Sequence, residues 1–235
     1  RRDRDRSQLL RRIRDLDAIA ERREALQQAR SWLAKEQDDQ IALEVDRIEE
    51  RLVSGPLVEL EVDGERRRYV LGSEITIGRA HADIVVHSSA VSRQHLKLSR
   101  IDGVAHVTDL DTRNGTALAG ARVTGSLPIG GGVDLELAGQ VSCRLTPLHA
   151  ADPHGALALT VAGERYVAPL GPLAIGSWQL VDAHDGDDRF IVLRTPPGAE
   201  PPHRGSYRLS HKIELCRGDR LAASRGGPIL LAVPE

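Results

Sequence analysis

Several residue types are scarce or missing in this chain of 235 residues. It has no methionine, two cysteines and only 3% aromatic residues, so its core must be built from Val, Leu, Ile and Ala. Cys143 and Cys216 form no CxxC pair, which argues against a disulfide scaffold or a thiolate metal site and favours a reducing compartment. We therefore expect a cytoplasmic protein without a metal or another cofactor.

Long apolar runs and a strong charge imbalance are also missing. No segment approaches the ~20 apolar residues of a membrane span, and no signal peptide is visible. The formal net charge is -2, so long-range attraction to nucleic acid is not indicated. Because the sequence starts with arginine and has no methionine, we expect an excerpt of a longer protein. A membrane segment or an enzyme domain upstream is left open.

Familiar catalytic motifs are missing as well. The sequence has no P-loop, nucleophile elbow, zinc-protease helix or kinase motif. The Gly-Gly-Gly run at residues 130–132 lies between strand patterns and is interpreted as a turn. The His-Asp-Gly-Asp-Asp run at residues 184–188 lacks further ligands at calcium-loop spacing and is interpreted as a charged hairpin turn. We expect a protein that is not an enzyme.

Residues 1–53 have the pattern of helices, with no Gly or Pro before residues 55–56. Apolar residues recur every three or four positions in three rows. These rows are Leu9, Ile13, Leu16 and Ala20; Ile19, Leu26 and Leu33; and Ile41, Val45, Ile48 and Leu52. Their phase changes near residues 22–23 and 35–40, which indicates a coiled coil with stutters or two helices folded into a hairpin.

The role of this helical segment stays open between two interpretations. It could be a stalk that joins copies into a homo-oligomer through residues 1–53, or a helix packed on its own globular neighbour. Trp32 lies on an apolar row and is expected to pack there. The first fourteen residues hold seven arginines and two aspartates, which would also suit the inner side of a membrane after an upstream span.

From residue 55 the pattern changes to the twofold period of strands. Val58, Leu60 and Val62 alternate with glutamates, and further short strands follow at close spacing. Turn signals such as Asp-Gly at residues 102–103 and Asn-Gly at residues 114–115 separate them. This pattern predicts a β-sandwich.

Three polar clusters lie where these strand patterns break into loops. They are Gly-Arg at residues 78–79, Ser-Arg-Gln-His at residues 92–95 and Asn-Gly-Thr at residues 114–116. If the strands share one sheet system, the loops converge and present arginines, a serine and an asparagine without a carboxylate. Guanidinium groups supply charge and the hydroxyl and amide supply direction, which suits a dianionic phosphate. Each cluster alone is ordinary, because surface arginines and Asn-Gly turns are common.

In order and spacing, the clusters and their surroundings resemble a forkhead-associated (FHA) domain. The resemblance covers roughly residues 57–147 and includes Ala-Asp-Ile-Val-Val at residues 82–86 and Asp-Leu-Asp-Thr-Arg-Asn-Gly-Thr at residues 109–116. It implies an FHA-type β-sandwich that binds a phosphothreonine peptide. The implied partner is a phosphothreonine-containing protein, either a Ser/Thr kinase or its substrate.

The resemblance implies a set of residues that contact the peptide. Arg79 would pair with the phosphate, Ser92 would donate its hydroxyl to a phosphate oxygen, and Arg93 would contact phosphate or peptide. Asn114 would hydrogen-bond the peptide main chain. Arg113 stands where the family often has a small hydroxyl residue, so that contact would be lost or replaced by a third guanidinium.

The resemblance also implies a set of supporting residues. His95 would fix the loop geometry from behind, and Gly78, Gly115 and Thr116 would shape the loops. Ala90 replaces a charged residue that helps some members to choose a peptide side chain, so an acidic preference is not supported.

Residues 155–235 repeat features of the middle domain after a linker expected at residues 150–155. The alternation at residues 157–161, followed by Gly-Glu-Arg, matches that at residues 58–62. The phosphate residues do not survive, because Ser177 replaces the arginine and Arg204 replaces the asparagine. We expect a second, degenerate FHA-like β-sandwich.

The sequence thus predicts a mainly β protein with a helical, coiled-coil-like segment (1–54), an FHA domain (55–149) and a degenerate FHA-like sandwich (155–235). The expected function is a phosphothreonine-binding adaptor in signalling, with the helix setting spacing or oligomeric state. Two alternatives are a scaffold of a larger assembly with a vestigial pocket, and a regulatory region of a longer enzyme or membrane protein.

Overall fold

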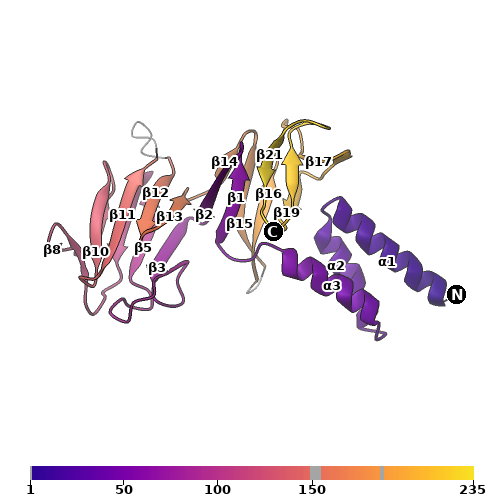
Figure 1. Cartoon of the computed structure of the whole chain (residues 1–235), viewed down its shortest axis with the longest axis horizontal. Coiled ribbons are helices and arrows are strands. Elements are labelled where there is room, and N and C mark those ends of the chain that lie inside the picture. Colours follow the sequence, from indigo (N-terminus) through magenta and orange to yellow (C-terminus); the bar gives the residue numbers. More distant parts are fainter. Residues whose placement is uncertain (1, 149–154, 186–187) are drawn as a thin grey trace. The chain divides into compact units, whose positions relative to one another are not determined.

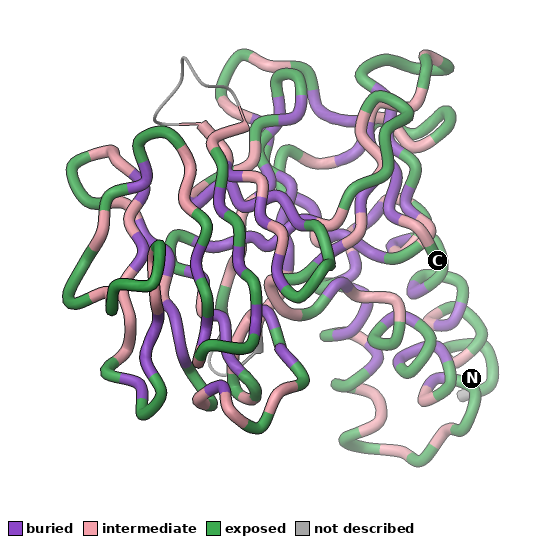
Figure 2. Tube along the Cα trace, turned by 60° about the vertical axis from the view of Figure 1, so that its left-hand side comes forward, coloured by how far each residue is buried: buried purple, intermediate pink, exposed green. Residues whose placement is uncertain are grey.

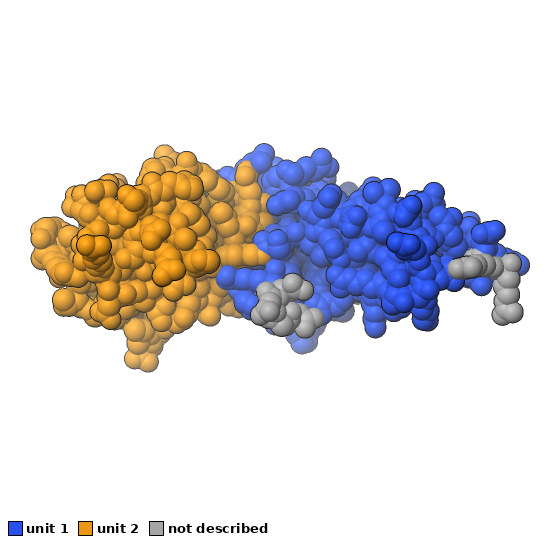
Figure 3. All heavy atoms as spheres, turned by 90° about the horizontal axis from the view of Figure 1, so that it is seen from below, with its two compact units in different colours: residues 1–54, 60–66, 174–235 blue, residues 55–59, 67–173 orange. Residues whose placement is uncertain are grey.

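A computed structural model describes residues 2–148, 155–185 and 188–235 (Figure 1). Most of the expected linker and the tip of the charged hairpin at residues 186–187 lie outside the described residues. The chain forms two compact units (Figure 3). Unit 1 comprises Arg1–Ser54, Leu60–Arg66 and Ala174–Glu235, and unit 2 comprises Gly55–Glu59 and Arg67–Leu173.

Unit 1 begins with three helices, α1 (Arg2–Ala18), α2 (Arg22–Leu33) and α3 (Asp39–Arg51). The predicted helical segment is therefore confirmed, but it consists of three short helices instead of a coiled coil with stutters or a two-helix hairpin. Their breaks fall where the apolar rows change phase. Ala20 has a left-handed φ of 63° at the first break. At the second break the Asp38 side chain caps α3 by accepting from the N–H groups of Gln40 and Ile41.

The apolar rows of the three helices pack against one another. They form one buried cluster of Leu10, Ile13, Leu16, Ala25, Leu26, Ala29, Ile41, Val45 and Ile48. Trp32 packs against this cluster, as predicted. Much of the apolar rows that suggested an oligomerising stalk is thus buried among the three helices, whereas Leu9, Ile19, Leu33 and Leu52 are only partly buried. None of the described helices combines the length and apolar character needed to cross a membrane.

A buried ion pair fixes α2 to the C-terminal part of unit 1. Arg22 Nη2 lies 2.6 Å from Asp219 Oδ1, Nη1 lies 3.0 Å from Oδ2, and each residue is only 1% exposed. Arg22 Nη1 also donates to the Glu214 carbonyl, and Asp219 accepts from the Cys216 N–H. These backbone contacts and the bidentate geometry offset the desolvation of the two charges.

The remainder of unit 1 is a β-sandwich of two sheets. One sheet has the order β14 (Leu173–Ile175), β15 (Trp178–Asp185), β16 (Asp188–Arg194), β19 (Lys212–Glu214). The other has the order β18 (Tyr207–Arg208), β17 (His203–Arg204), β20 (Arg220–Ala222), β21 (Ile229–Ala232), and β1 (Leu57–Val62) pairs with β21. Leu180 and Leu193 on the first sheet and Leu221 and Leu231 on the second are fully buried.

Unit 2 is also a two-sheet sandwich, and it holds the predicted site. Its first sheet has the order β4 (Ile84–Val85), β3 (Glu74–Gly78), β5 (Leu96–Ile101), β6 (Val104–Asp109), β9 (Ser126–Pro128). Its second sheet has the order β2 (Glu65–Val70), β13 (Glu164–Ala168), β12 (Leu157–Val161), β11 (Val141–Pro147), β10 (Val133–Leu137), β7 (Thr116–Leu118), β8 (Ala121–Arg122). Along the strands, buried residues alternate with exposed ones (Figure 2), as expected for sheets with one covered face.

The units divide the chain at other places than the expected boundaries of residues 55–149 and 155–235. β12 and β13 continue the second sheet of unit 2 beyond β11, whereas residues 60–62 of β1 belong to unit 1 and pair with β21. The strand orders nevertheless repeat. The order β18-β17-β20-β21 in unit 1 matches β8-β7-β10-β11 in unit 2, and β14-β15-β16-β19 matches β3-β5-β6-β9. This shared order supports the repeat that the sequence indicated.

We expect Arg22→Ala to lower the free energy of unfolding of unit 1 by up to about 3–5 kcal/mol, because the buried Asp219 carboxylate then keeps only the more distant Arg204, 3.7 Å away, as a cationic partner. Both tryptophans, Trp32 and Trp178, lie in unit 1, so the urea-induced change in tryptophan fluorescence measures this directly. The matched control is Arg12→Ala, which removes an exposed ion pair with Glu24 and should have little effect. Equal effects of the two substitutions would contradict the prediction.

Candidate functional site

The three predicted loops lie together in unit 2. The first follows β3, and two backbone hydrogen bonds join it to the second loop, from Arg79 N–H to the Ser92 carbonyl (2.9 Å) and from Ala80 N–H to the Arg93 carbonyl (3.1 Å). The third loop lies between β6 and β7. Asn114 Nδ2 in this loop donates to the carbonyl of Ala90 in the second loop at 2.8 Å. The predicted convergence of the loops is therefore confirmed.

Gly78 makes the close approach of the first two loops feasible. A Cβ atom at this position would lie 2.1 Å from the carbonyl oxygen of Arg93 and 2.7 Å from its carbonyl carbon. Because both are backbone atoms in a hydrogen-bonded loop, they cannot move aside as a flexible side chain would. Glycine is therefore required here by the available space.

The buried side chain of His95 joins the second and third loops. Its Nδ1 accepts a hydrogen bond from the Ser92 N–H at 3.1 Å, and its Nε2 lies 3.1 Å from the Gly115 carbonyl and 3.3 Å from Thr112 Oγ1. Since Nδ1 faces a donor and Nε2 faces a carbonyl, the proton is assigned to Nε2. One neutral imidazole thus fixes the backbone on both sides of the site.

Asp109 organises the third loop, a role that the sequence did not predict. Its carboxylate accepts from the Thr112 N–H at 2.9 Å and from the hydroxyls of Thr112 (2.9 Å) and Thr116 (2.6 Å). The signal that could have revealed it is the Asp-x-x-Thr spacing, because an aspartate commonly bonds backbone and hydroxyl groups just downstream in a turn. Arg122 was missed as well, and it donates to the Thr112 carbonyl at 3.1 Å.

The side chains that the sequence proposed for ligand contact lie at the surface of these loops. Arg79, Arg93, Arg113 and Asn114 are exposed, and Ser92 is half-buried. Within the described part of the chain, the three guanidinium groups make no hydrogen bond or ion pair. Three uncompensated positive charges on adjoining, braced loops are suited to an anionic ligand.

Burial lowers the pKa of His95 below its ordinary value of 6.5, although the Gly115 carbonyl and the Asp109 carboxylate act to raise it. For Asp109, burial acts to raise the pKa, but the hydrogen bonds from Thr116 and Thr112 outweigh it and the pKa is lowered. At neutral pH the site is therefore held by a neutral imidazole and an ionised carboxylate.

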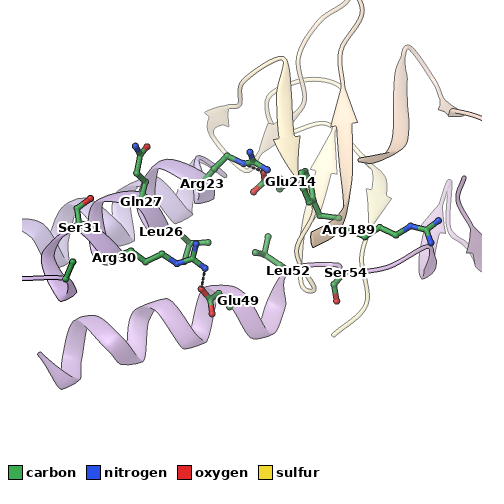
Figure 4. Close-up of a pocket in the computed structure, with 12 residues that line it drawn as sticks. Arg23, Leu26, Gln27, Arg30, Ser31, Glu49, Leu52, Ser54, Arg189 and Glu214 are labelled. Atoms are coloured by element: carbon green, nitrogen blue, oxygen red, sulfur yellow. Dashed lines mark hydrogen bonds and ion pairs between the residues drawn. The ribbon is translucent and has the colours of Figure 1, made fainter. Parts of the chain in front are cut away.

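A cavity in unit 1 offers a contrast to these loops. It has a volume of about 840 Å³ and lies between α2, α3 and the strands that carry Arg189 and Glu214 (Figure 4). Its arginines are all paired with carboxylates: Arg23 with Glu214 at 2.6 Å, Arg30 with Glu49 at 2.6 Å and Arg189 with Asp182 at 2.8 Å. With its charges balanced, this cavity does not have the character of an anion site. Among the described residues, no group of three or more His, Cys, Asp or Glu side chains is placed to hold a metal ion.

Comparison with protein families decides what kind of domain surrounds the loops. The model of the FHA domain matches residues 75–137, which include all nine predicted site residues. The chain contains an FHA domain. FHA domains are phosphothreonine-dependent protein-interaction modules, a binding family and not a catalytic one. The match does not extend to the C-terminal repeat.

Solved structures of FHA domains are similar to part of the chain. FHA-1 of Rv1747 from Mycobacterium tuberculosis is 26% identical, with 36% of this chain and 87% of that chain covered and a TM-score of 0.28. The FhaA FHA domain, solved in complex with the intracellular domain of Rv3910, is 32% identical, with 34% and 91% covered and a TM-score of 0.27. The Slr1951 protein from Synechocystis sp. is 32% identical, with 37% and 90% covered and a TM-score of 0.29. Because these TM-scores are low, the assignment rests on the family model and the loop residues. No curated protein matches the sequence.

We expect Gly78→Ala to destabilise unit 2 by at least about 1–3 kcal/mol, because the added methyl group forces backbone atoms of two loops apart. Hydrogen exchange of the amides in β5 and β6 measures the stability of the sheet beside the loops. Gly130→Ala is the matched control, because a Cβ atom there has no neighbour within 4 Å. Similar exchange rates in the two variants would argue against the space constraint.

The stability of unit 2 should fall as pH decreases below about 6.5, because the unfolded chain then binds a proton at His95 that the folded domain resists. Above that pH the neutral His95 makes its full contribution to the stability of unit 2. The slope is at most about 1.4 kcal/mol per pH unit for one proton. Hydrogen exchange in β5 and β6 between pH 7 and pH 5, corrected for intrinsic rates, measures it. His95→Gln should remove this slope, and the exposed His87→Gln should keep it; the reverse pattern would refute the assignment.

Proposed function

We propose that the FHA domain binds phosphothreonine peptides and makes this chain a non-catalytic adaptor in Ser/Thr-kinase signalling. The observation that carries the proposal is the set of three exposed guanidinium groups, Arg79, Arg93 and Arg113, which have no partner within the described residues. Elsewhere in the fold, arginines such as Arg22 and Arg30 are held by carboxylates. Uncompensated arginines on loops that are fixed by other contacts favour an anionic ligand from outside the chain.

The proposed roles divide between the phosphate and the peptide main chain. Arg79 pairs with the phosphate, the Ser92 hydroxyl donates to a phosphate oxygen, and Arg93 adds charge beside them. Asn114 uses one N–H for the Ala90 carbonyl, which leaves its Oδ1 to accept from a peptide N–H. In the family, a small apolar niche for the extra methyl group favours phosphothreonine over phosphoserine. Arg113 supplies a third guanidinium in place of a hydroxyl.

The fixed loop geometry supports tight binding. Ser92 and Gly115 are both held by His95, and the third loop is held by Asp109. Because these contacts exist before a ligand arrives, little conformational entropy would be lost on binding. The partner would be a phosphothreonine-containing protein, a Ser/Thr kinase or its substrate, in the reducing cytosol that the cysteine usage suggested. The helices would serve this adaptor as a folded part of unit 1, because much of their apolar rows is buried.

Titration of the full chain with labelled phosphothreonine, phosphoserine and unmodified versions of one peptide tests the proposal. A degenerate library around the phosphothreonine first supplies a binding sequence. We expect phosphothreonine to bind best, and Arg79→Ala to weaken it by about 2–5 kcal/mol, which is roughly 30-fold to several thousand-fold. Arg144→Ala, which removes an exposed arginine of the same unit, should leave the affinity unchanged.

Two results would overturn the proposal. One is a wild-type chain that binds phosphorylated and unmodified peptides equally, which would favour a scaffold with a vestigial pocket. The other is equal loss of affinity in Arg79→Ala and Arg144→Ala, which would mean that the peptide responds to net charge alone. Raising the salt concentration separates these cases further, because a general charge effect is screened more strongly than a paired phosphate.

A further inference from the structure

Two segments of the chain have nearly the same structure. In residues 57–70, β1 and β2 are joined by Asp63 and Gly64, with φ values of 50° and 79°. In residues 157–168, β12 and β13 are joined by Ala162 and Gly163, with φ values of 51° and 86°. Both turns therefore have the left-handed pair of residues that suits a tight two-residue hairpin turn. We refer to these segments as the first hairpin and the second hairpin.

The strands of the two hairpins occupy equivalent positions in different units. β12 pairs with β11 from Cys143↔Val161 to Pro147↔Leu157, and β1 pairs with β21 through Val62↔Leu231. β11 and β21 are equivalent strands of the two sandwiches. β11 pairs with β10 through Leu135↔Cys143, and β21 pairs with β20 through the corresponding pair Leu221↔Leu231. β1 therefore takes beside β21 the place that β12 takes beside β11, although β1 precedes the FHA domain in sequence.

We propose that the two hairpins are exchangeable, and that the native chain holds them exchanged. The FHA sandwich is then completed by residues 157–168, which follow it, and its own first hairpin supplies β1 to the C-terminal sandwich. The alternative arrangement, in which each sandwich keeps its own hairpin, uses the same two strand positions. The binding sandwich consequently depends on the C-terminal segment for its last strands.

The inner faces of the first strands are alike, whereas those of the second strands differ. Leu157, Leu159 and Val161 in β12 are 1–2% exposed; the corresponding residues of β1 are Val58 and Leu60, which are buried, and Val62, which is half-buried. In β13, Tyr166 belongs to the core of unit 2, whereas the corresponding residue of β2 is the exposed Arg67. The hydrophobic effect therefore favours the exchanged arrangement.

The exits from the hairpins are also alike. Each hairpin is followed by a Leu-Gly pair, and Gly72 and Gly171 have φ values of 151° and 155°. Such values are costly for any other residue, and they differ by only a few degrees between the two repeats. The chain thus leaves both hairpins through a glycine with a similar φ, which favours the replacement of one exit by the other.

Outward-facing charges distinguish the two arrangements. Thr160 in β12 lies opposite Arg144 on one side and Arg165 on the other. In the alternative arrangement Glu61, which corresponds to Thr160, would face Arg144. A charge placed at residue 160 therefore stabilises or destabilises the exchanged form without touching the core.

A competition for one native cysteine tests the proposal. In the full chain with Cys216→Ala, the substitutions V62C and V161C give Cys143 two rival partners. Val161 is its observed register partner, whereas residue 62 faces Cys143 only when each sandwich keeps its own hairpin. Directly opposed strand residues have the separation that a disulfide needs. Because burial raises the pKa of Cys143 to about 12, the bond is formed during refolding in a glutathione buffer.

Peptide mapping by mass spectrometry then gives the ratio of the 161–143 disulfide to the 62–143 disulfide. We expect the 161–143 bond to dominate. The matched variants T160E and T160R should raise and lower this ratio, and they should differ by roughly three-fold or more, since residue 160 faces Arg144 only in the exchanged arrangement. Arg165 lies in the same hairpin and faces residue 160 in both arrangements, so its effect cancels. Circular dichroism of the reduced variants checks that both are folded.

Each other outcome contradicts a stated part of the proposal. A dominant 62–143 bond in the chain without a change at residue 160 would mean that each sandwich keeps its own hairpin. Equal ratios in T160E and T160R would mean that the hairpins are not exchangeable. A 161–143 bond between two chains, seen as a dimer without reductant, would overturn completion within one chain. No step of this test involves phosphopeptide binding, so its failure and that of the proposed function are distinguishable.

Discussion

The binding loops depend on one imidazole. His95 is fully buried, and its two nitrogens contact the backbone of two different loops, at Ser92 and at Gly115. Both contacts need a neutral ring with its proton on Nε2, and burial lowers the pKa of the ring in the direction that keeps it so. The surface arginines stay charged without any help from His95. Their positions, however, depend on the loop backbone that His95 holds.

The arginines of this protein differ in whether a carboxylate within the chain pairs with them. Arginine is abundant, yet in unit 1 the most buried one, Arg22, is held by Asp219, and those around the cavity of Figure 4 are held by glutamates and an aspartate. These pairs join helices to strands and to each other. The loops of the FHA domain contain arginines of the same chemistry without carboxylates. The proposed binding arginines thus differ from the buried and paired ones in having no carboxylate partner within the described residues, and only a three-dimensional structure reveals this difference.

The meeting of the three loops could be predicted from the sequence, whereas the limits of the two compact units could not. The loops were identified because their short motifs, such as Ser-Arg-Gln-His, occur together in the order and spacing of an FHA domain, and the helix breaks were visible as changes of phase. Asp109 acts through hydrogen bonds within its own turn and could have been found by its spacing to Thr112. Arg22 could not, because nothing in an arginine-rich helix marks the one side chain that meets Asp219, 197 positions later. The strand exchange was equally hidden, since Val58 and Leu60 have the same pattern as Leu157 and Leu159 and would fit beside either β11 or β21.

The pairing of β1 with β21 has a consequence for the order of events during synthesis. β1 leaves the ribosome long before its partner β21. Until β21 is made, the edge of β1 that will face it is open, and open strand edges are prone to aggregate. β11 and β12, in contrast, are close in sequence and can pair as soon as they emerge. The loops of the FHA domain would therefore be assembled before β1 meets β21, so the C-terminal sandwich is completed by a strand made before the FHA domain.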